Sequence, residues 1–591
     1  MSFDLFLPVS RADLKKRGWD VLDVIIVTGD AYVDHPSFGA AIIGRVLEAE
    51  GFRVGIIAQP DWRTRSDFAK LGKPRLFFGV TSGNIDSMLN HYTANRRLRH
   101  DDAYSPGDRY GLRPNRAVIV YANRIKQIYG PIPIVLGGIE AGLRRLAHYD
   151  FWDDEVRRSV LVDSRADMIV YGMGEKPVIE LAKRMQAKEP INGIKNICGT
   201  VVVSSCIDNI PDCIRLPSYE EVKTSNAAFN EAEKIILAEL DPVHGKPISQ
   251  MHGNRHVIQL PPAKPLSTAE MDRCYELPFN RRWHPLYDGS GGVPALETVK
   301  FSITSHRGCY GDCSFCSLAL HMGKQIQSRS IESIVREVKT LCKENNFKGI
   351  ISDIGGPTSN MYMSRCSRWI EKGICKERNC IMPKKCPHLK LGHGEILKLW
   401  DEVLKIPKVR KVFVSTGVRY DLLSDADAEI YLEELCRNHV SGQLKIAPEH
   451  VDEEVLAIMN KPPFEIYNAF CRKYEVINKK LNKKQYLVPY FISSHPGSTL
   501  KSMLNLAFHI KKLGYFPEQI QDFIPMPMTR ATAMYHTGRD PITGKRVYCA
   551  KSPKEKKMQK ALIHFKDRRN RKLVAEALKI LKREDLIKTL R

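Results

Sequence analysis

Three cysteines stand within eight residues near the middle of the chain: Cys309, Cys313 and Cys316. Thiolates are soft ligands that suit zinc or iron–sulfur clusters. A structural zinc site needs four ligands, whereas three cysteines leave one iron of a [4Fe–4S] cluster open to a substrate or cofactor. Because C-x3-C-x2-C is not a zinc-finger spacing, we expect an iron–sulfur cluster here. The alternative is a zinc knuckle that takes His306 or His321 as its fourth ligand.

Four further cysteines follow within twenty-one residues: Cys366, Cys375, Cys380 and Cys386. Four thiolates suit structural zinc or an auxiliary iron–sulfur cluster. Cys386 precedes a proline, as does the final cysteine of bacterial ferredoxin runs, so we favour a second Fe–S cluster over zinc. The segment is rich in Lys and Arg, which would suit an anionic substrate or RNA; a solvated loop is the alternative. We expect the other eight cysteines to be small core residues.

The three-cysteine loop falls at the start of a repeating pattern of apolar strands and helix-length segments. Six repeats are two short of a closed eightfold barrel, so we predict an incomplete, TIM-like (β/α)6 barrel over residues 299–548, with a cysteine-rich insertion at 360–390. Chemistry in such barrels gathers at the C-terminal ends of the strands. The expected strands are Phe301–Thr304, Gly349–Ser352, Val412–Ser415, Gln443–Ile446, Tyr486–Phe491 and Ile520–Phe523.

The first 205 residues show another alternation of short apolar runs and helical periodicity, which predicts a parallel sheet covered on both faces. We interpret residues 1–205 as a Rossmann-like domain, 206–298 as a less regular connector, and 549–591 as a basic helical tail. Ligands of such sheets bind beyond the C-terminal ends of the strands. The expected strands are Val24–Val27, Val54–Ile57, Leu76–Val80, Ala117–Val120, Ile132–Leu136 and Met168–Val170.

The cysteine pattern C-x3-C-x-aromatic-C after the first barrel strand resembles the signature of the radical S-adenosylmethionine (SAM) superfamily. Most of the chain, from the N-terminal domain to the basic tail, resembles the YgiQ-type family of uncharacterised radical SAM proteins. The resemblance implies that Cys309, Cys313 and Cys316 ligate a [4Fe–4S] cluster whose fourth iron binds SAM. It also implies reductive cleavage of SAM to methionine and a 5′-deoxyadenosyl radical, with an unknown substrate. The reaction could be a methylation, a thiolation or a rearrangement.

The same resemblance implies further cofactor-binding residues in the loops that follow the barrel strands. Gly355 and Gly356 match a Gly-Gly element whose backbone meets the SAM amino group, although proline replaces its acidic residue. Arg419 could hold the SAM carboxylate, and Glu449 could meet the ribose or act on substrate. The backbone of residues 493–497 would approach the adenine. For each of these the alternative is an ordinary turn or helix cap.

Many radical SAM enzymes carry a Rossmann-like, cobalamin-binding domain before the barrel, and this chain is arranged similarly. Such domains often contain Asp-x-His-x-x-Gly, whose histidine reaches cobalt. The nearest run here, Asp34–Gly39, has the wrong spacing. The spacing argues against cobalamin bound through His35. We therefore expect cobalamin not to be a cofactor, and the domain to cap the barrel or grip substrate.

Composition limits the other function classes. The 591 residues carry a net charge of +24, and residues 551–591 hold fifteen Lys/Arg against five Asp/Glu. This tail could attract nucleic acid, although a solvated basic helix explains it equally well. No apolar run suits a membrane span or a signal peptide, so we expect a cytoplasmic protein without membrane attachment, reduced by a donor such as flavodoxin or ferredoxin. The competing hypothesis is a non-catalytic RNA-binding or redox-sensing metalloprotein.

Overall fold

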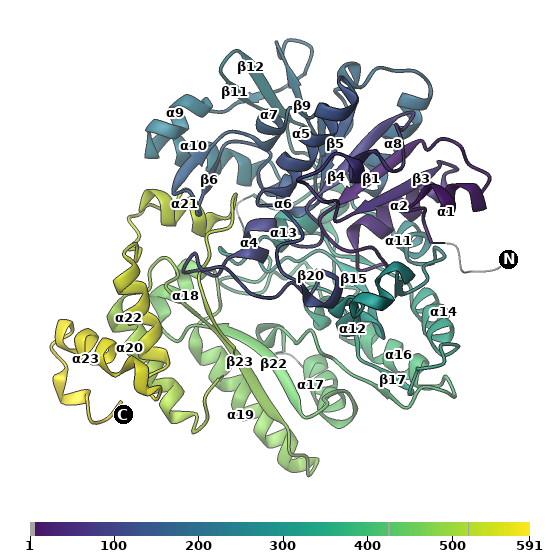
Figure 1. Cartoon of the computed structure of the whole chain (residues 1–591). Coiled ribbons are helices and arrows are strands. Elements are labelled where there is room, and N and C mark those ends of the chain that lie inside the picture. Colours follow the sequence, from purple (N-terminus) through teal and green to yellow (C-terminus); the bar gives the residue numbers. More distant parts are fainter. Residues whose placement is uncertain (1–5, 377, 424–425, 518, 591) are drawn as a thin grey trace. The chain divides into compact units, whose positions relative to one another are not determined.

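A computed structural model describes residues 6–376, 378–423, 426–517 and 519–590. The chain folds into two compact units. The first runs to Thr304 and adds Leu320–Leu341 and Arg368–Ile374; the second comprises Ser305–Ala319, Cys342–Ser367 and the chain from Cys375 onward. Figure 1 shows their helices and strands coloured along the sequence. No helix in these ranges has the length and apolar character needed to cross a membrane.

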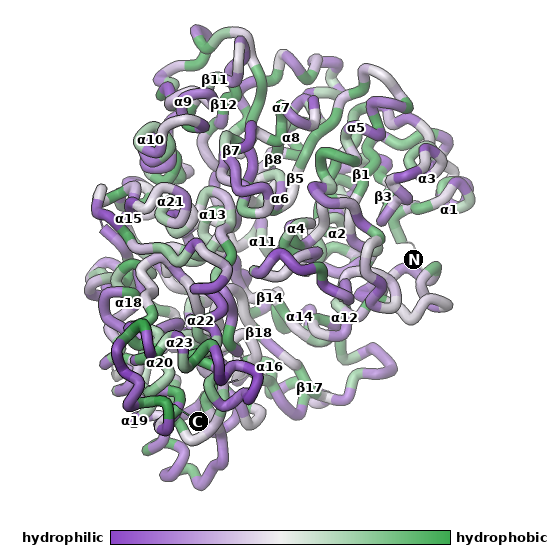
Figure 2. Tube along the Cα trace, turned by 60° about the vertical axis from the view of Figure 1, so that its left-hand side comes forward, coloured by the Kyte–Doolittle hydropathy of each residue, from purple (hydrophilic) through white to green (hydrophobic). Residues whose placement is uncertain are grey.

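The first unit is built on a nine-stranded sheet in the order β10-β11-β12-β9-β8-β5-β4-β1-β3. Five of its strands are parallel, and their order in space follows the flavodoxin-like pattern 2-1-3-4-5. Val/Ile-rich strands form because both faces of the sheet are buried, and they are mostly green in Figure 2. This confirms the predicted α/β, Rossmann-like fold. The parallel strands are β1 (Val24–Thr28), β3 (Val54–Ala58), β4 (Phe77–Thr81), β5 (Ile134–Gly137) and β8 (Met168–Val170).

One expected strand of this unit is a helix. The apolar run Ala117–Val120 forms the first turn of α5 (Ala117–Tyr129). Its buried residues recur with helical spacing, at Ala117, Val118, Tyr121, Ala122 and Ile125. Four apolar residues alone do not distinguish a buried strand from a buried helix, so the strand prediction was wrong. The other long helices are α2 (Gly39–Ala49), α8 (Glu175–Gln186) and α10 (Asn226–Ala238).

Residues 206–298, expected as a connector, extend the same sheet. After β9 (Thr200–Ser204) the chain forms β10 (Ile214–Arg215), β11 (Ile248–His252) and β12 (Arg255–Gln259). Pairing across β8, β9, β12 and β11 is antiparallel, so the sheet is mixed rather than wholly parallel. The edge strand β10 has only two residues, and at the opposite edge Ile56 N of β3 donates to Pro8 O at 2.8 Å.

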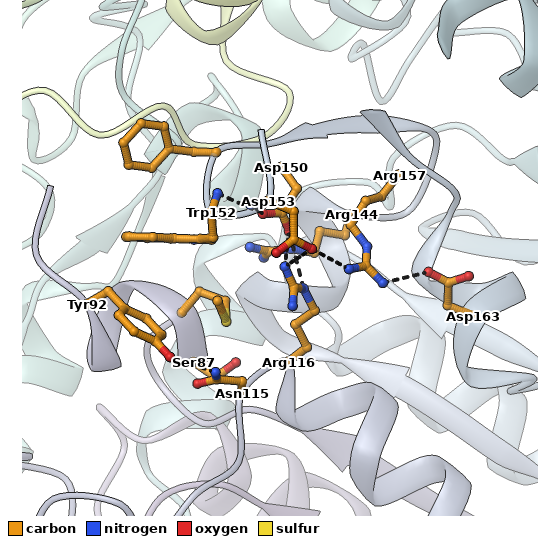
Figure 3. Close-up of polar contacts among 12 residues, drawn as sticks. Ser87, Tyr92, Asn115, Arg116, Arg144, Asp150, Trp152, Asp153, Arg157 and Asp163 are labelled. Atoms are coloured by element: carbon orange, nitrogen blue, oxygen red, sulfur yellow. Dashed lines mark hydrogen bonds and ion pairs between the residues drawn. The ribbon is translucent and has the colours of Figure 1, made fainter. Parts of the chain in front are cut away.

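A short hairpin in the first unit, with only three residues in each strand, is stabilised by ion pairs. It joins β6 (His148–Asp150) to β7 (Glu155–Arg157), and Figure 3 shows the charged side chains around it. Arg116 Nη2 lies 3.1 Å from Asp150 Oδ2 and 2.6 Å from Asp153 Oδ2. Burial alone would raise the pKa of Asp150, but Arg144 and Arg116 outweigh it and lower that pKa. The buried carboxylate therefore stays charged and paired.

The second unit contains the remaining barrel elements. Parallel ladders join β17 (Ile350–Ile351) to β21 (Lys411–Val412), and β22 (Gln443–Glu449) to β23 (Tyr486–Ser493) and β24 (Ile520–Asp522). They overlap the predicted strands, although β21 shares only Val412 with the predicted Val412–Ser415. β14 (Ser302–Thr304), which belongs to the first unit, precedes the three-cysteine loop as expected. The intervening helices are α16 (His393–Leu404), α17 (Ala426–Glu434), α18 (Glu453–Met459), α19 (Phe464–Lys480) and α20 (Leu500–Lys512).

The basic tail is helical and packs within this unit through its apolar residues. It forms α22 (Pro553–Ile563) and α23 (Arg571–Ile580). Leu562 and Leu578 are buried in one cluster with Leu504 of α20. The apolar faces of both tail helices are therefore used inside the unit, while most of the Lys and Arg side chains are exposed.

We predict that a buried acid in the first unit makes stability fall as pH rises. Glu233 on α10 is 3% exposed. Burial raises its pKa to about 8, and Arg145 only partly offsets that shift. Between pH 4.5 and 8 the folded state keeps a proton that the unfolded state has lost, so folding weakens with increasing pH. Glu233→Gln should therefore stabilise the protein at pH 8 by on the order of 1–3 kcal/mol.

The gain should disappear below pH 4.5, where both states are protonated. Thermal unfolding followed by circular dichroism across this pH range measures it. Glu231→Gln, an exposed acid on the same helix, is the matched control and should change little. A variant that is less stable than the wild type at pH 8 would show that Glu233 is charged and usefully paired.

Candidate metal centre

The three-cysteine loop is fixed by backbone hydrogen bonds on both sides. Ser314 N donates to Met459 O at 3.0 Å, and Ser314 O accepts from Ala531 N at 2.8 Å. Asn460 Nδ2 donates to Asp312 O at 2.8 Å. These contacts hold the loop between the end of α18 and the start of α21 (Arg530–Thr537). A loop anchored in this way can present its thiols in a defined arrangement.

The three thiols share one environment. Burial raises the pKa of Cys316 to about 12, and the neighbouring Cys313 thiolate adds to the shift. Burial also raises the pKa of Cys309, which Cys313 increases further and Arg419 decreases. Without a metal these two thiols are therefore neutral, whereas ligation would deprotonate them. The donor set consists of soft thiols, which fits iron–sulfur chemistry.

No three His, Cys, Asp or Glu side chains in the described ranges converge as ligands of one ion would. In a [4Fe–4S] cluster each cysteine binds a different iron, so its three ligands need not meet at one point. The electrostatic coupling of Cys309, Cys313 and Cys316 shows that the loop brings them together. His306, the alternative zinc ligand, has Nδ1 2.9 Å from Ser305 Oγ, and burial lowers its pKa to about 3.

Arg419 lies beside these thiols. Its Nη1 lies 3.6 Å from Cys313 Sγ, within hydrogen-bonding distance for sulfur. Its Nε donates to Asp421 Oδ1 at 3.0 Å and its Nη2 to Asp421 Oδ2 at 2.6 Å. The arginine predicted from the sequence to reach SAM is thus engaged by a carboxylate and a cysteine of the loop.

A second cation, Lys461, lies close by and was missed by the sequence analysis. It is 6% exposed, and its Nζ is 5.9 Å from the ring centroid of Tyr420. Its charge lowers the pKa of Cys309 and of Glu449. No hydrogen bond or ion pair from its ammonium is found among the described residues. Lys461 stands in an Asn-Lys-Pro-Pro run after α18, which gives no sequence signal for a ligand contact.

Glu449 occupies an unusual backbone position at the end of β22. Its φ is +68°, in the left-handed region that a non-glycine residue rarely adopts. The register of β22 against β23 shifts between Ile446 and Glu449. Burial raises the pKa of Glu449, and Lys461 and Arg419 lower it in part. Because its charge also affects Cys316, the predicted Glu449 does lie near the cysteine loop.

The Gly355–Gly356 pair is closely packed. Gly355, the last residue of β18 (Asp353–Gly355), accepts a 2.7 Å hydrogen bond from Ser305 N. A Cβ on Gly356 would lie 2.5 Å from His306 O and 2.8 Å from the His306 ring. Gly356 is therefore required by packing against the segment that leads into the cysteine loop, whereas a Cβ on Gly355 would lie 2.5 Å from Thr416 Oγ1. The structure places this glycine pair beside the cysteine loop, as predicted, and close packing explains why glycine stands at both positions.

The loop after β23 also reaches the cysteine loop. His495 is buried, and its Nε2 lies 3.3 Å from Ser314 Oγ. Its ring meets the Phe315 ring edge-on, with centroids 5.7 Å apart. Burial lowers the pKa of His495 to about 3, so the ring is neutral. Loops from β22 and β23 thus lie with the cysteine loop at one end of the strands, as the barrel interpretation expects.

The second cysteine group lies on a loop closed by a short hairpin. Cys366 of β19 (Arg365–Cys366) pairs with Leu389 of β20 (Leu389–Lys390). Cys386 N donates to Cys380 O at 2.8 Å, and Leu389 N donates to Cys386 O at 3.0 Å. The hairpin thus brings Cys366 near the turn that carries Cys386. Cys375 is partly exposed on the same loop.

His35 in the first unit is held by the chain itself. It is buried, its Nε2 lies 3.0 Å from Arg281 Nη1, and its Nδ1 lies 3.1 Å from Ser37 N. Burial, together with the Arg281 charge, keeps its pKa well below the usual range. Both ring nitrogens therefore lie within hydrogen-bonding distance of nitrogen atoms of the chain, and the neutral ring accepts at one of them.

Family models match nearly the whole chain. Residues 6–302 match the radical SAM N-terminal model, and residues 303–506 match the radical SAM superfamily model. Residues 518–589 match a domain of unknown function, DUF3362. A UPF0313 protein of Clostridium botulinum (strain ATCC 19397 / Type A) is 54% identical over 98% of this chain and 90% of its own length. One from Methanocella arvoryzae is 53% identical over 98% and 96%.

The chain belongs to the UPF0313 family of the radical SAM superfamily. It is accordingly a radical SAM enzyme, with the iron–sulfur and SAM chemistry of that superfamily. This family membership confirms the resemblance seen in the cysteine spacing.

Solved structures similar to this UPF0313 chain include two radical SAM enzymes. The methyltransferase TsrM from Kitasatospora setae, with cobalamin and a [4Fe–4S] cluster bound, is 14% identical, with a TM-score of 0.49 over 90% of this chain and 84% of that chain. The cobalamin-dependent enzyme OxsB is 11% identical, with a TM-score of 0.47 over 89% and 57%.

The expectation that cobalamin is not a cofactor is wrong as stated. It rested on one missing motif, Asp-x-His-x-x-Gly, around His35. The radical SAM N-terminal match over residues 6–302 contradicts it. A motif for one cobalt ligand does not decide whether a domain binds the rest of a corrin.

We predict that alanine at position 356 destabilises the second unit. The added Cβ would force the backbone away from His306, at a cost of roughly 1–3 kcal/mol typical of overpacking. Thermal or urea unfolding of the purified variant measures the loss. Gly394→Ala, at an exposed helical position with open space around the new Cβ, should be neutral or slightly stabilising. Equal effects of the two substitutions would contradict the packing role of Gly356.

Proposed function

We propose that this protein cleaves SAM reductively at a [4Fe–4S] cluster held by Cys309, Cys313 and Cys316. The observation that supports this most directly is the anchored loop, whose three thiols lie together beside Arg419 and Lys461. When bound, the cluster would supply an electron for the cleavage of SAM to methionine and a 5′-deoxyadenosyl radical. The radical would then act on a substrate that the sequence does not identify. A small donor such as flavodoxin or ferredoxin would reduce the cluster.

The surrounding residues suit the polar groups of SAM. The sequence assigned the SAM carboxylate to Arg419, but Arg419 already pairs with Asp421. Lys461 is mostly buried, and its ammonium forms no hydrogen bond or ion pair with a described residue, although its charge lowers the pKa of Glu449 and of Asp421. We propose that this ammonium binds the SAM carboxylate. The backbone at Gly355 and Gly356 would meet the amino group.

Glu449 is the acid best placed to act beyond the cofactor. Because burial raises its pKa, it can exchange a proton nearer to neutral pH than an exposed glutamate. Its left-handed backbone fixes the direction of the side chain at the end of β22. We propose that Glu449 hydrogen-bonds the ribose or a substrate group.

We predict that replacing any of the three cysteines abolishes SAM cleavage. Anaerobically reconstituted wild-type protein should carry about four irons for this cluster, and reduction by dithionite should yield 5′-deoxyadenosine and methionine. Cys309→Ala, Cys313→Ala and Cys316→Ala should each lose that iron and both products. Cys206→Ala, an exposed cysteine of the first unit, is the control and should retain them. Wild-type protein that binds iron yet forms no 5′-deoxyadenosine would favour the non-catalytic alternative.

We also predict a separate metal site at the second cysteine group. Replacing Cys366, Cys375, Cys380 and Cys386 together by alanine should remove either about four further irons or about one zinc. Elemental analysis of the reconstituted protein distinguishes the two metals, with Cys206→Ala again as control. If the quadruple variant keeps all of the wild-type iron and zinc, these cysteines hold no metal.

A further inference from the structure

We infer that Arg419 serves the cluster rather than SAM: its guanidinium hydrogen-bonds the Cys313 thiolate and raises the reduction potential of the cluster. The inference rests on the proposed function, because it takes Cys309, Cys313 and Cys316 as the cluster ligands. It makes Arg419 a positioning and tuning residue, distinct from the groups that bind SAM.

The guanidinium is held so that one of its nitrogens faces Cys313. Its bidentate pair with Asp421 uses Nε and Nη2, at 3.0 and 2.6 Å, and leaves Nη1 directed at Cys313 Sγ, 3.6 Å away. The Arg419 side chain is only 11% exposed and that of Asp421 4% exposed. A bidentate pair shielded from water fixes the plane of the guanidinium, so the third nitrogen cannot swing freely toward another anion.

The backbone of Arg419 is fixed as firmly as its side chain. Arg419 N donates to Asn360 Oδ1, and Asn360 Nδ2 donates to Arg419 O, both at 2.9 Å. Asn360 is fully buried and its Oδ1 also accepts from Thr358 Oγ1 at 3.2 Å. The side-chain amide of Asn360 therefore pairs with both the backbone N–H and the backbone carbonyl of Arg419. Because both its backbone and its side chain are fixed, Arg419 keeps its guanidinium at a constant distance from Cys313.

The cysteine loop is shaped to accept the guanidinium. A Cβ at Gly311 would overlap Arg419 Nη1 and lie 3.3 Å from Cys309 Sγ. Gly311 N itself donates to Cys309 Sγ at 3.4 Å. Glycine is thus required at the second position after Cys309 because the arginine occupies the space of its side chain. The loop and Arg419 fit as one built site, independently of the hydrogen bond to Cys313.

The physical consequence concerns the charge that the cluster gains on reduction. A nearby cation and a hydrogen bond to a ligand sulfur stabilise the more negative, reduced state, so they raise the potential. Asp421 opposes this by partly neutralising Arg419. Removing the arginine and removing the aspartate should therefore shift the potential in opposite directions.

Redox titration of the reconstituted full-length protein, followed by electron paramagnetic resonance, tests this. Arg419→Gln should lower the midpoint potential of the SAM cluster, Asp421→Asn should raise it, and Arg419→Lys should fall between Arg419→Gln and wild type. SAM affinity, measured by equilibrium binding to the oxidised protein, should change by less than about tenfold in Arg419→Gln. Arg437→Gln, which breaks an exposed arginine–glutamate pair of the same unit, should leave both quantities unchanged.

The possible outcomes separate the inference from the proposed function. A wild-type protein that assembles no cluster on Cys309, Cys313 and Cys316 would refute the proposed function itself. If the wild-type protein assembles the cluster, and both Arg419→Gln and Asp421→Asn have the wild-type midpoint potential, the inference alone is refuted. If the potentials are unchanged and Arg419→Gln binds SAM more than about tenfold more weakly, Arg419 binds the SAM carboxylate instead. If Arg419→Gln fails to fold, Asp421→Asn, which retains the arginine, decides by the direction of its shift.

Discussion

Negative charge buried at the three-cysteine loop must be balanced within the protein, and this requirement organises the site. Once the three cysteines bind a cluster, their thiolates and Glu449 would gather in a region with little exposure to water, where unpaired charges are costly. Arg419 and Lys461 supply the opposite charge from two different segments. Asp421 in turn keeps Arg419 from being an uncompensated cation. Removing one member changes the electrostatic environment of all the others.

The same requirement explains much of the first unit. Arg113 is fully buried, and it bridges Asp30 and Asp102 at 3.0 Å each, beyond the strands β1 and β4 where the strand order reverses. Arg45 is likewise buried against Asp34. Because a buried pair that loses one partner leaves an isolated charge, these arginines fix the loops at the ligand-binding edge of the sheet. Buried arginine–carboxylate pairs thus fix the loops at the expected binding sites of both units.

The sequence predicted what depends on local pattern and missed what depends on distant contacts. The parallel strands and the cysteine loop follow from apolar runs and spacing, which are readable along the chain. Ala117–Val120 was misassigned because the burial that makes it helical comes from tertiary packing. The residues after 206 were not recognised as strands of the sheet, since β10 has only two residues and β11 and β12 pair antiparallel, without the strand–helix alternation of the parallel strands.

The site shows the same limit. Spacing identified Cys309, Cys313 and Cys316 and the glycines that follow the second strand. Their positions after predicted strands also identified Arg419 and Glu449 as candidate cofactor-binding residues. It could not show that Arg419 turns toward Asp421 and Cys313, or that Lys461 enters the site, because both depend on side-chain packing across the fold.

The two edges of the nine-stranded sheet bear on how the protein behaves at high concentration. An exposed, long edge strand is a template for pairing with another molecule. Here β10 ends one edge after two residues, and Pro8 covers part of the other by accepting from Ile56. Neither edge offers another chain a full row of unpaired backbone groups. The sheet therefore leaves little of either edge open to pairing with another strand.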